Sequence, residues 1–205
     1  MTTNHLEILV EEPSMEACLR GLLPKLIPGG MTFEVYPSLS KQNLLKNLPA
    51  RLHGYSKWLP QDWRIIVIVD RDDDDCHELK QKMEETACKA GLRTRVSDPS
   101  SWQVVNRLAI EELESWFFGD MDAVRSTYPR VSKTIEYKAP FRDPDAIRGG
   151  TREAFERVLQ KAGYFREGLP KIRVAREIGQ QLDPNRNRSH SFEVFRDVVL
   201  EALGA

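Results

Sequence analysis

The sequence predicts an α/β fold in which helices flank a mostly parallel sheet, followed by a helical subdomain. The first observation is the run Ile-Ile-Val-Ile-Val at 65–69, which is apolar without alternation, as a strand buried on both faces is. The second is the alternation of strand and helix patterns over residues 6–118. The third is a change after Asp120, where Pro and Gly punctuate helical stretches. We therefore expect an α/β domain over 1–120 and a helical subdomain over 121–205.

Each expected element has a local signal. Short β-rich runs predict strands at residues 6–10, 31–36, 63–70, 92–96 and 102–110. Apolar residues at helical spacing predict helices from Ser14 to Pro28, over 41–58 with a break near Pro49, over 77–90 and over 111–118. The helices expected in the second part are 151–163, 171–182 and 192–203. Trp116, Phe117 and Phe118 adjoin Leu113 in a helical run, so we expect them in the core.

Composition excludes several classes of protein. Lys and Arg together number 30 against 31 Asp and Glu, so nucleic-acid binding would have to come from local basic patches. The three cysteines are an odd number without zinc spacing, which suits a reducing cytosol. The N-terminus has no signal-peptide pattern, and no stretch approaches the roughly 20 apolar residues of a membrane span. We expect a soluble cytoplasmic protein that does not associate with membranes.

Five aspartates crowd the end of the central apolar run, at Asp70 and from Asp72 to Asp75. Open α/β sheets bind their ligands at the carboxyl ends of strands, and crowded carboxylates repel one another unless a cation or a helix N-terminus offsets them. Oxygen ligands without nearby His or Cys favour Mg²⁺ or Mn²⁺ over zinc. The alternative is that these residues cap the helix beginning near Cys76. Capping a helix needs only one acidic residue, whereas this segment has five, so we favour a metal site.

Further acids follow other predicted strands. Glu11 and Glu12 come directly after the first strand, so their carboxylates converge on the aspartates if the two strands are neighbours. Glu111 and Glu114 open a later helix, where acids favourably oppose the helix dipole. Their i, i+3 spacing places them on one face, from which one of them would complete the metal site.

These acids carry a resemblance to a known fold. Residues 9–14 (Leu-Val-Glu-Glu-Pro-Ser) and 68–72 (Ile-Val-Asp-Arg-Asp) resemble the paired glutamate and Asp-x-Asp signatures of a Toprim domain. Toprim domains occur in topoisomerases, primases and nucleases of the OLD (overcoming lysogenization defect) type. Through segments 11–16, 69–76 and 110–117, most of the chain is similar to a bacterial Toprim-like family known as domain of unknown function 4276. Members of that family often accompany an ATPase in phage-defence settings.

The resemblance implies roles for individual residues. Glu11 would be the general acid/base or first metal ligand, and Asp70 and Asp72 would be the metal carboxylates. OLD-type nucleases place further acids just beyond each motif. In a two-metal scheme, cations about 4 Å apart activate water and stabilise the leaving oxygen of a phosphodiester. Together with the acids above, the predicted metal ligands are Glu11, Glu12, Glu16, Asp70, Asp72, Asp73, Asp75, Glu111 and Glu114.

Basic residues in loop-rich stretches are predicted to hold nucleic-acid phosphates beside this site. They are Lys138, Arg142, Arg148, Arg186 and Arg188. The alternative is that they are ordinary solvated surface. No Walker motif is present, since Gly149-Gly150-Thr151 opens a helix without the required Lys, so ATP hydrolysis by this chain itself is not expected.

The sequence thus predicts Mg²⁺-dependent cleavage of DNA or RNA, as one component of a bacterial anti-phage defence system with an ATPase partner. The alternative is a non-catalytic Toprim-like module that binds a partner ATPase or a nucleotide. A third reading, a small-molecule phosphohydrolase of the acidic α/β type, needs an aspartate nucleophile, a downstream Lys and a further acidic pair that we cannot place. The choice between DNA and RNA and the oligomeric state stay open.

Overall fold

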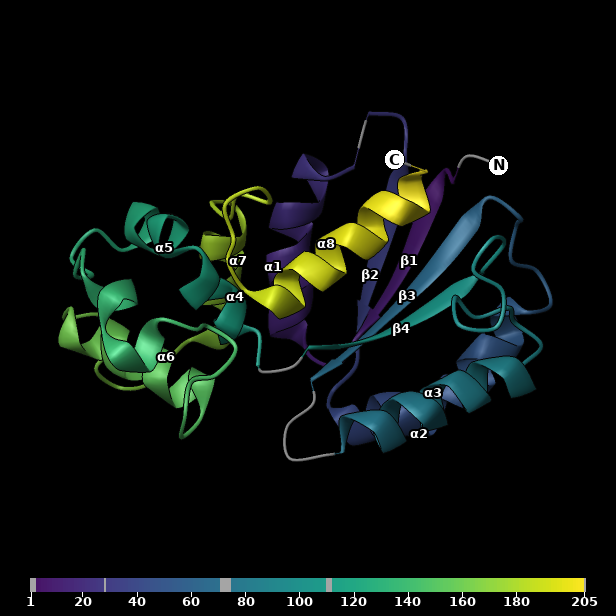
Figure 1. Cartoon of the computed structure of the whole chain (residues 1–205), viewed down its shortest axis with the longest axis horizontal. Helices are drawn as coiled ribbons and strands as arrows, with labels where there is room; N and C mark the ends of the chain where they lie inside the picture. Colours follow the sequence, from purple (N-terminus) through teal and green to yellow (C-terminus); the bar gives the residue numbers. More distant parts are fainter. Residues whose placement is uncertain (1–2, 28, 71–74, 110–111, 205) are drawn as a thin grey trace.

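The computed structural model describes residues 3–27, 29–70, 75–109 and 112–204. Within these residues, four parallel strands form one sheet in the order β2-β1-β3-β4 (Figure 1). The strands are β1 (His5–Val10), β2 (Thr32–Pro37), β3 (Trp63–Asp70) and β4 (Val104–Ala109). They are connected by the helices α1 (Pro13–Leu22), α2 (Lys41–Tyr55) and α3 (Cys76–Lys89), with a short 3-10 turn η1 (Leu23–Lys25) after α1. The predicted α/β class, a parallel sheet flanked by helices, is confirmed.

The central strand β3 is buried on both faces, as its unbroken apolar run predicts. Ile66 and Ile68 belong to the core on the side of α1, whereas Ile65, Val67 and Val69 belong to the core on the side of α2 and α3. Successive strand residues point to opposite faces, so every position of such a strand meets an apolar layer.

The strand order creates a switch point between β1 and β3. From β1 the chain moves to β2 on one side, then crosses back to place β3 on the other side of β1. The register pairs Val10 with Ile68, so both strands end at the same edge of the sheet. In open α/β sheets this is where ligands bind.

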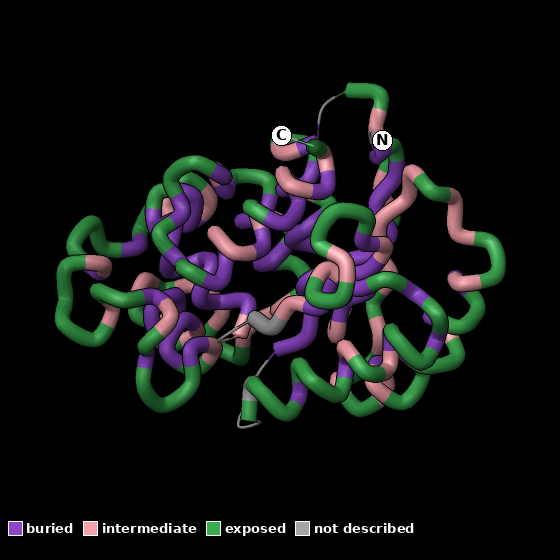
Figure 2. Tube along the Cα trace, turned by 45° about the vertical axis from the view of Figure 1, so that its right-hand side comes forward, coloured by how far each residue is buried: buried purple, intermediate pink, exposed green. Residues whose placement is uncertain are grey.

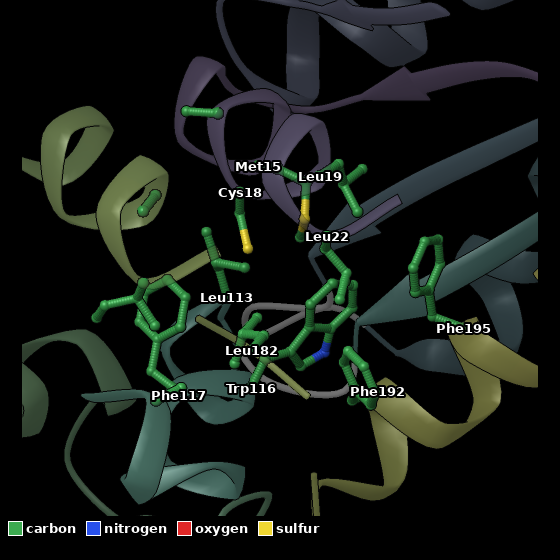
Figure 3. Close-up of a cluster of buried hydrophobic side chains, with 14 of the residues drawn as sticks. Met15, Cys18, Leu19, Leu22, Leu113, Trp116, Phe117, Leu182, Phe192 and Phe195 are labelled. Carbon is green, nitrogen blue, oxygen red and sulfur yellow. The ribbon is translucent and has the colours of Figure 1, made fainter. Parts of the chain in front are cut away.

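The remaining helices pack against the α1 face of the sheet and beyond it (Figure 1). They are α4 (Glu114–Gly119), α5 (Met121–Thr127), η2 (Ile135–Tyr137), η3 (Ala139–Phe141), α6 (Thr151–Lys161), α7 (Lys171–Gly179) and α8 (His190–Leu203). As expected, α4 buries its aromatic residues: the Trp116 ring stacks on Phe195 at 5.1 Å and meets Phe192 edge-on at 5.3 Å (Figure 3). None of the described helices is long and apolar enough to cross a membrane.

One core joins the two predicted parts of the chain. Buried side chains of α1 and the sheet belong to the same apolar cluster as those of α4 to α8, and buried residues run through both halves of the molecule (Figure 2). The helical part therefore rests on the sheet through a shared interior, and the boundary at residue 120 stays a prediction.

Residues 92–96 do not form the predicted strand. Only Thr94 makes an isolated bridge, to Val104, before the chain turns. The Ser97 hydroxyl accepts from the Thr94 backbone N–H at 2.9 Å, and the Asp98 backbone N–H donates to the Thr94 carbonyl. Such local polar hydrogen bonds offer the backbone an alternative to a sheet ladder, and here they prevail over the apolar signal of Leu92 and Val96.

Two helix details also differ from the prediction. Helix α1 has Glu12 at its N-cap and Pro13 in its first turn, where the missing N–H of proline is harmless, so Ser14 is not the cap. Helix α2 runs through Pro49 without the predicted break. Its buried residues Leu44, Leu48 and Leu52 share one face, and their packing against the sheet offsets the cost of the proline.

Candidate functional site

Two of the predicted acids meet at the switch point of the sheet. Glu11 directly follows β1, and Asp70 is the last residue of β3. The Glu11 carboxylate accepts a hydrogen bond from the backbone N–H of Asp70, with Oε2 to N at 3.1 Å. Asp70 is 8% exposed. Neighbouring parallel strands therefore bring carboxylates that are 59 positions apart to one edge of the sheet.

Asp75 has a structural role at the same end of the sheet. It is the N-cap of α3, and its Oδ1 accepts from the backbone N–H groups of Glu78 at 3.1 Å and His77 at 2.8 Å. These two donors hold the pKa of Asp75 below its usual value. Asp75 thus sits as the capping interpretation expects. Asp72 and Asp73 lie outside the described residues.

Glu12 is paired with a lysine that the sequence analysis did not identify. Lys171 is the first residue of α7, and its Nζ lies 3.3 Å from Glu12 Oε2. The Ser14 hydroxyl also donates to Glu12. The pair joins the beginning of α1 to the beginning of α7, directly beside Glu11.

Glu114 is buried in the first turn of α4, and its surroundings are acidic. The pKa of Glu114 is raised to about 7, mainly by burial and to a smaller extent by the negative charges of Glu112 and Glu12, whereas a backbone hydrogen bond and Lys171 act in the opposite direction. Glu112 Oε2 accepts from the backbone N–H of Arg152, at the start of α6, at 2.7 Å. The acids around Glu114 therefore include Glu112, a residue without a predicted role, while Glu111 lies outside the described residues.

Glu16 is engaged elsewhere on α1. Its Oε1 accepts from Arg20 Nε at 2.9 Å, and the same guanidinium lies 3.3 Å from Glu34 Oε2 on β2. The Glu16 carboxylate thus takes part in a salt-bridge network between α1 and β2.

The donor chemistry at this edge suits Mg²⁺ or Mn²⁺. Glu11 and Asp70 offer carboxylate oxygens, the ligands that both ions prefer. Among the residues that the structure describes, no cluster of three or more His, Cys, Asp or Glu forms a complete cation site. The third predicted carboxylate, Asp72, is not among them.

Three of the five predicted phosphate-binding residues line two separate cavities. Lys138 lines a cavity of about 360 Å³, whereas Arg186 and Arg188 line another of about 230 Å³. Arg186 also holds the buried Asp120 with two hydrogen bonds, at 2.8 and 3.0 Å, which gives it a structural task. Arg148 is exposed. Arg142, also exposed, donates to the Tyr137 carbonyl at 3.2 Å.

Other basic residues at the larger cavity were missed by the sequence analysis. Arg130, Arg157 and Lys161 line it together with Lys138. A signal for two of them was present, because Arg157 and Lys161 are spaced i, i+4 on a predicted helix. No local signal pointed to Lys171, whose partner is 159 positions away in the chain.

Comparison with known proteins identifies a family. A family model described as "Domain of unknown function (DUF4276)" matches residues 10–200. No curated protein matches the chain. Among solved structures, the chain is similar to the "C-terminal region of the Burkholderia pseudomallei OLD protein", with 16% sequence identity and a TM-score of 0.43, over 97% of this chain and 100% of that one. Because the family model covers nearly the whole sequence, the chain belongs to the DUF4276 family, as its motifs predict.

Proposed function

We propose that this protein is a metal-dependent nuclease that cleaves phosphodiester bonds in DNA or RNA, within a bacterial anti-phage defence system that includes an ATPase. The observation that carries the proposal is the contact between Glu11 and Asp70 at the switch point. Carboxylates at this position of an open α/β sheet are placed for ligand chemistry, and the cap of α3 is supplied by Asp75.

In this proposal Glu11, Asp70 and Asp72 hold Mg²⁺ or Mn²⁺. The bound metal would supply a Lewis acid that activates water and stabilises the leaving oxygen. The Asp70 backbone N–H fixes the Glu11 carboxylate in position through its hydrogen bond. The buried position of Asp70 keeps bulk water from most of its side chain, which strengthens its interaction with a cation.

Lys171 would make this edge approachable for a polyanion. Its ammonium group offsets the charge of Glu12, and both side chains are about one-third exposed. A phosphate that approaches Glu11 is therefore repelled less by Glu12, because the Lys171 charge offsets that of the Glu12 carboxylate. The remaining candidates, Glu16, Asp73, Asp75, Glu111 and Glu114, would contribute at most additional charge or second-site ligands in this scheme.

The test is a cleavage assay on labelled single- and double-stranded DNA and RNA with Mg²⁺, Mn²⁺ or EDTA. Loss of a metal ligand costs more than the roughly 10- to 100-fold typical of second-shell groups, so Asp70→Asn and Glu11→Gln should lose more than about 100-fold in cleavage rate. Glu167→Gln is the matched control, because Glu167 is an exposed acid in the α6–α7 loop. This control should cleave at the wild-type rate.

The non-catalytic alternative gives a different result in the same assay. A module that binds an ATPase or a nucleotide would cut nothing under any metal, and its partner binding would be unaffected by Asp70→Asn. The assay is therefore run with the chain alone and with any ATPase encoded beside its gene. If wild type cuts neither DNA nor RNA in both settings, the nuclease proposal is abandoned.

A further inference from the structure

A cavity of about 360 Å³ lies between α6 and the η2–η3 segment, residues 135–141. Its volume falls in the range of about 300 to 1,000 Å³ that is usual for small-molecule sites. On the α6 side, Ala154, Val158 and Ala162 recur every four residues and so share one face. On the opposite side lies Phe141, whose ring stacks on the buried Phe118 at 5.2 Å and is held in place by it. The lining is thus apolar and partly aromatic.

The rim of this cavity is basic. Arg157 and Lys161 stand one turn apart on α6, and Lys138 faces them from the junction of η2 and η3. All three are exposed, and no described carboxylate forms an ion pair with any of them. Arg130 is engaged differently: it donates to the Gly163 carbonyl at 3.1 Å and lies over the Tyr164 ring at 4.2 Å.

This arrangement of charges favours an anionic ligand. Like charges at i, i+4 on a helix destabilise it slightly, and the nearby ammonium group of Lys138 adds to the repulsion from Arg157 and Lys161. A bound anion would relieve that repulsion. The apolar lining, with the Phe141 ring on one side, favours a flat and weakly polar group in the rest of the ligand. A ligand that satisfies both has a planar ring and a phosphate.

We propose that this cavity binds one nucleotide, with its base against the apolar lining and its phosphate between Arg157, Lys161 and Lys138. Proteins that bind unpaired nucleic acid combine positively charged grooves with aromatic side chains on which bases stack, and Phe141 is such a side chain here. A base in a duplex is stacked on its neighbours and cannot enter such a cavity. The nucleotide is therefore either free or part of a single strand.

Helix α6 connects the cavity to the acids around Glu114. Its start contacts one of them through the hydrogen bond from Arg152 N–H to Glu112, whose charge acts on Glu114 together with that of Glu12. At a rise of about 1.5 Å per residue, Arg157 and Lys161 lie about 7 and 14 Å further along the helix axis. Assigning the nucleotide to the strand being cut rests on the proposed nuclease, whereas recognition of the nucleotide itself does not.

The test is equilibrium binding in EDTA, where no cleavage occurs. The probes are AMP, ribose 5-phosphate, inorganic phosphate, a fluorescent single-stranded oligonucleotide and the matching duplex. The test variant is Arg157→Glu with Lys161→Glu. The control carries the same charge change on exposed lysines of α2 and α3, as Lys46→Glu with Lys80→Glu.

Wild type should bind AMP at least about tenfold more tightly than ribose 5-phosphate or phosphate, because only AMP has a base. The test variant should lose at least about tenfold in affinity for AMP and for the single strand, and the control less than about threefold.

If AMP binds and the oligonucleotide does not, the ligand is a free nucleotide. If both bind, the ligand is a nucleotide within a single strand. Equal affinity for AMP and ribose 5-phosphate, or equal losses in the two double variants, would overturn the proposal. Nucleotide binding in EDTA without cleavage in Mg²⁺ would overturn the nuclease and leave the cavity assignment standing.

Discussion

Gly179 of α7 lies directly against the backbone of Cys18 in α1: a Cβ atom on Gly179 would come within 2.5 Å of the Cys18 carbonyl oxygen. Gly21 of α1 is equally close to α7, since a Cβ there would meet Gln180 N at 2.8 Å. Only glycine permits so close an approach of two helix backbones. The same packing brings Lys171, at the other end of α7, to Glu12.

Gly179→Ala should destabilise the protein. The new methyl group has to displace backbone, which costs about 1–3 kcal/mol for overpacking, and a domain of this size loses about 2–4 °C in Tm per kcal/mol. Gly54→Ala in α2 is the matched control, because a Cβ at Gly54 meets nothing within 4 Å and alanine favours a helix by about 0.5–1 kcal/mol. Thermal melts should therefore move in opposite directions for the two variants. Equal shifts would show that α1 and α7 do not pack as described.

Divalent metal should stabilise the native state through Glu11 and Asp70. A ligand that binds only the folded protein at ten times its Kd adds about 1.4 kcal/mol, which is about 3–6 °C in Tm here. Melts with millimolar Mg²⁺ or Mn²⁺ should show this increase in wild type and in Glu167→Gln. In Asp70→Asn the increase should nearly vanish, and a full shift in that variant would place the metal elsewhere.

Stability should fall with rising pH because of Glu114. Its pKa is about 7 in the folded protein and about 4.5 in the unfolded chain, so between these values the folded state holds a proton that the unfolded state has lost. The contribution is complete below pH 4.5 and is lost by pH 7, for a total of about 3 kcal/mol. Denaturant unfolding in EDTA should show Glu114→Gln more stable than wild type at pH 8 by this order, with the difference disappearing at pH 4.5. A constant difference across this range would contradict the raised pKa.

The charge of Lys171 sets part of that pH window. Lys171 lowers the pKa of Glu114, whereas Glu112 and Glu12 raise it. Lys171→Met should therefore move the loss of stability to higher pH. Lys161→Met, on the exposed side of α6, is the control and should leave the window in place.

Cys18 should resist alkylation in the native protein. Burial, with a smaller effect from the charge of Glu114, raises the pKa of its thiol to about 12, so its thiolate population at a given pH is lower by roughly a thousandfold than at the usual value of about 9. Cys88 is exposed. In a Cys76→Ser background, iodoacetamide should label Cys88 rapidly and Cys18 only after denaturant is added, as peptide mass analysis would show. Equal labelling of both would mean that α1 is not covered by α4 and α7.

Local pattern was enough to predict the central part of the fold. The apolar run that ends at Asp70 and the shorter one that ends before Glu11 predict neighbouring parallel strands, and parallel strands end at a common edge. That geometry alone brings the two acids together. The helix of α4 and its buried Trp116 also followed from spacing.

Other features depend on contacts that no local pattern records. The pairing of Glu12 with Lys171 arises from the packing of α1 on α7, and the burial of Glu114 from the helices that close over it. At Thr94, apolar neighbours favoured a strand while side-chain hydrogen bonds favoured a turn, and single-residue propensities do not decide between them. The hydrogen bonds prevail here because they join residues only three positions apart in the chain.

The shared core has a consequence for synthesis on the ribosome. The apolar face of α1, with Leu19 and Leu22, belongs to a core that is completed by later helices, the last of which is α8, ending at Leu203. At about 5–20 residues per second, roughly 10 to 40 s pass between translation of α1 and of the end of α8. During that interval the nascent sheet and α1 expose an apolar surface to water, which makes the incomplete chain prone to aggregate. This chain should therefore depend on chaperones while it is being made, and truncations near residue 120 should be insoluble.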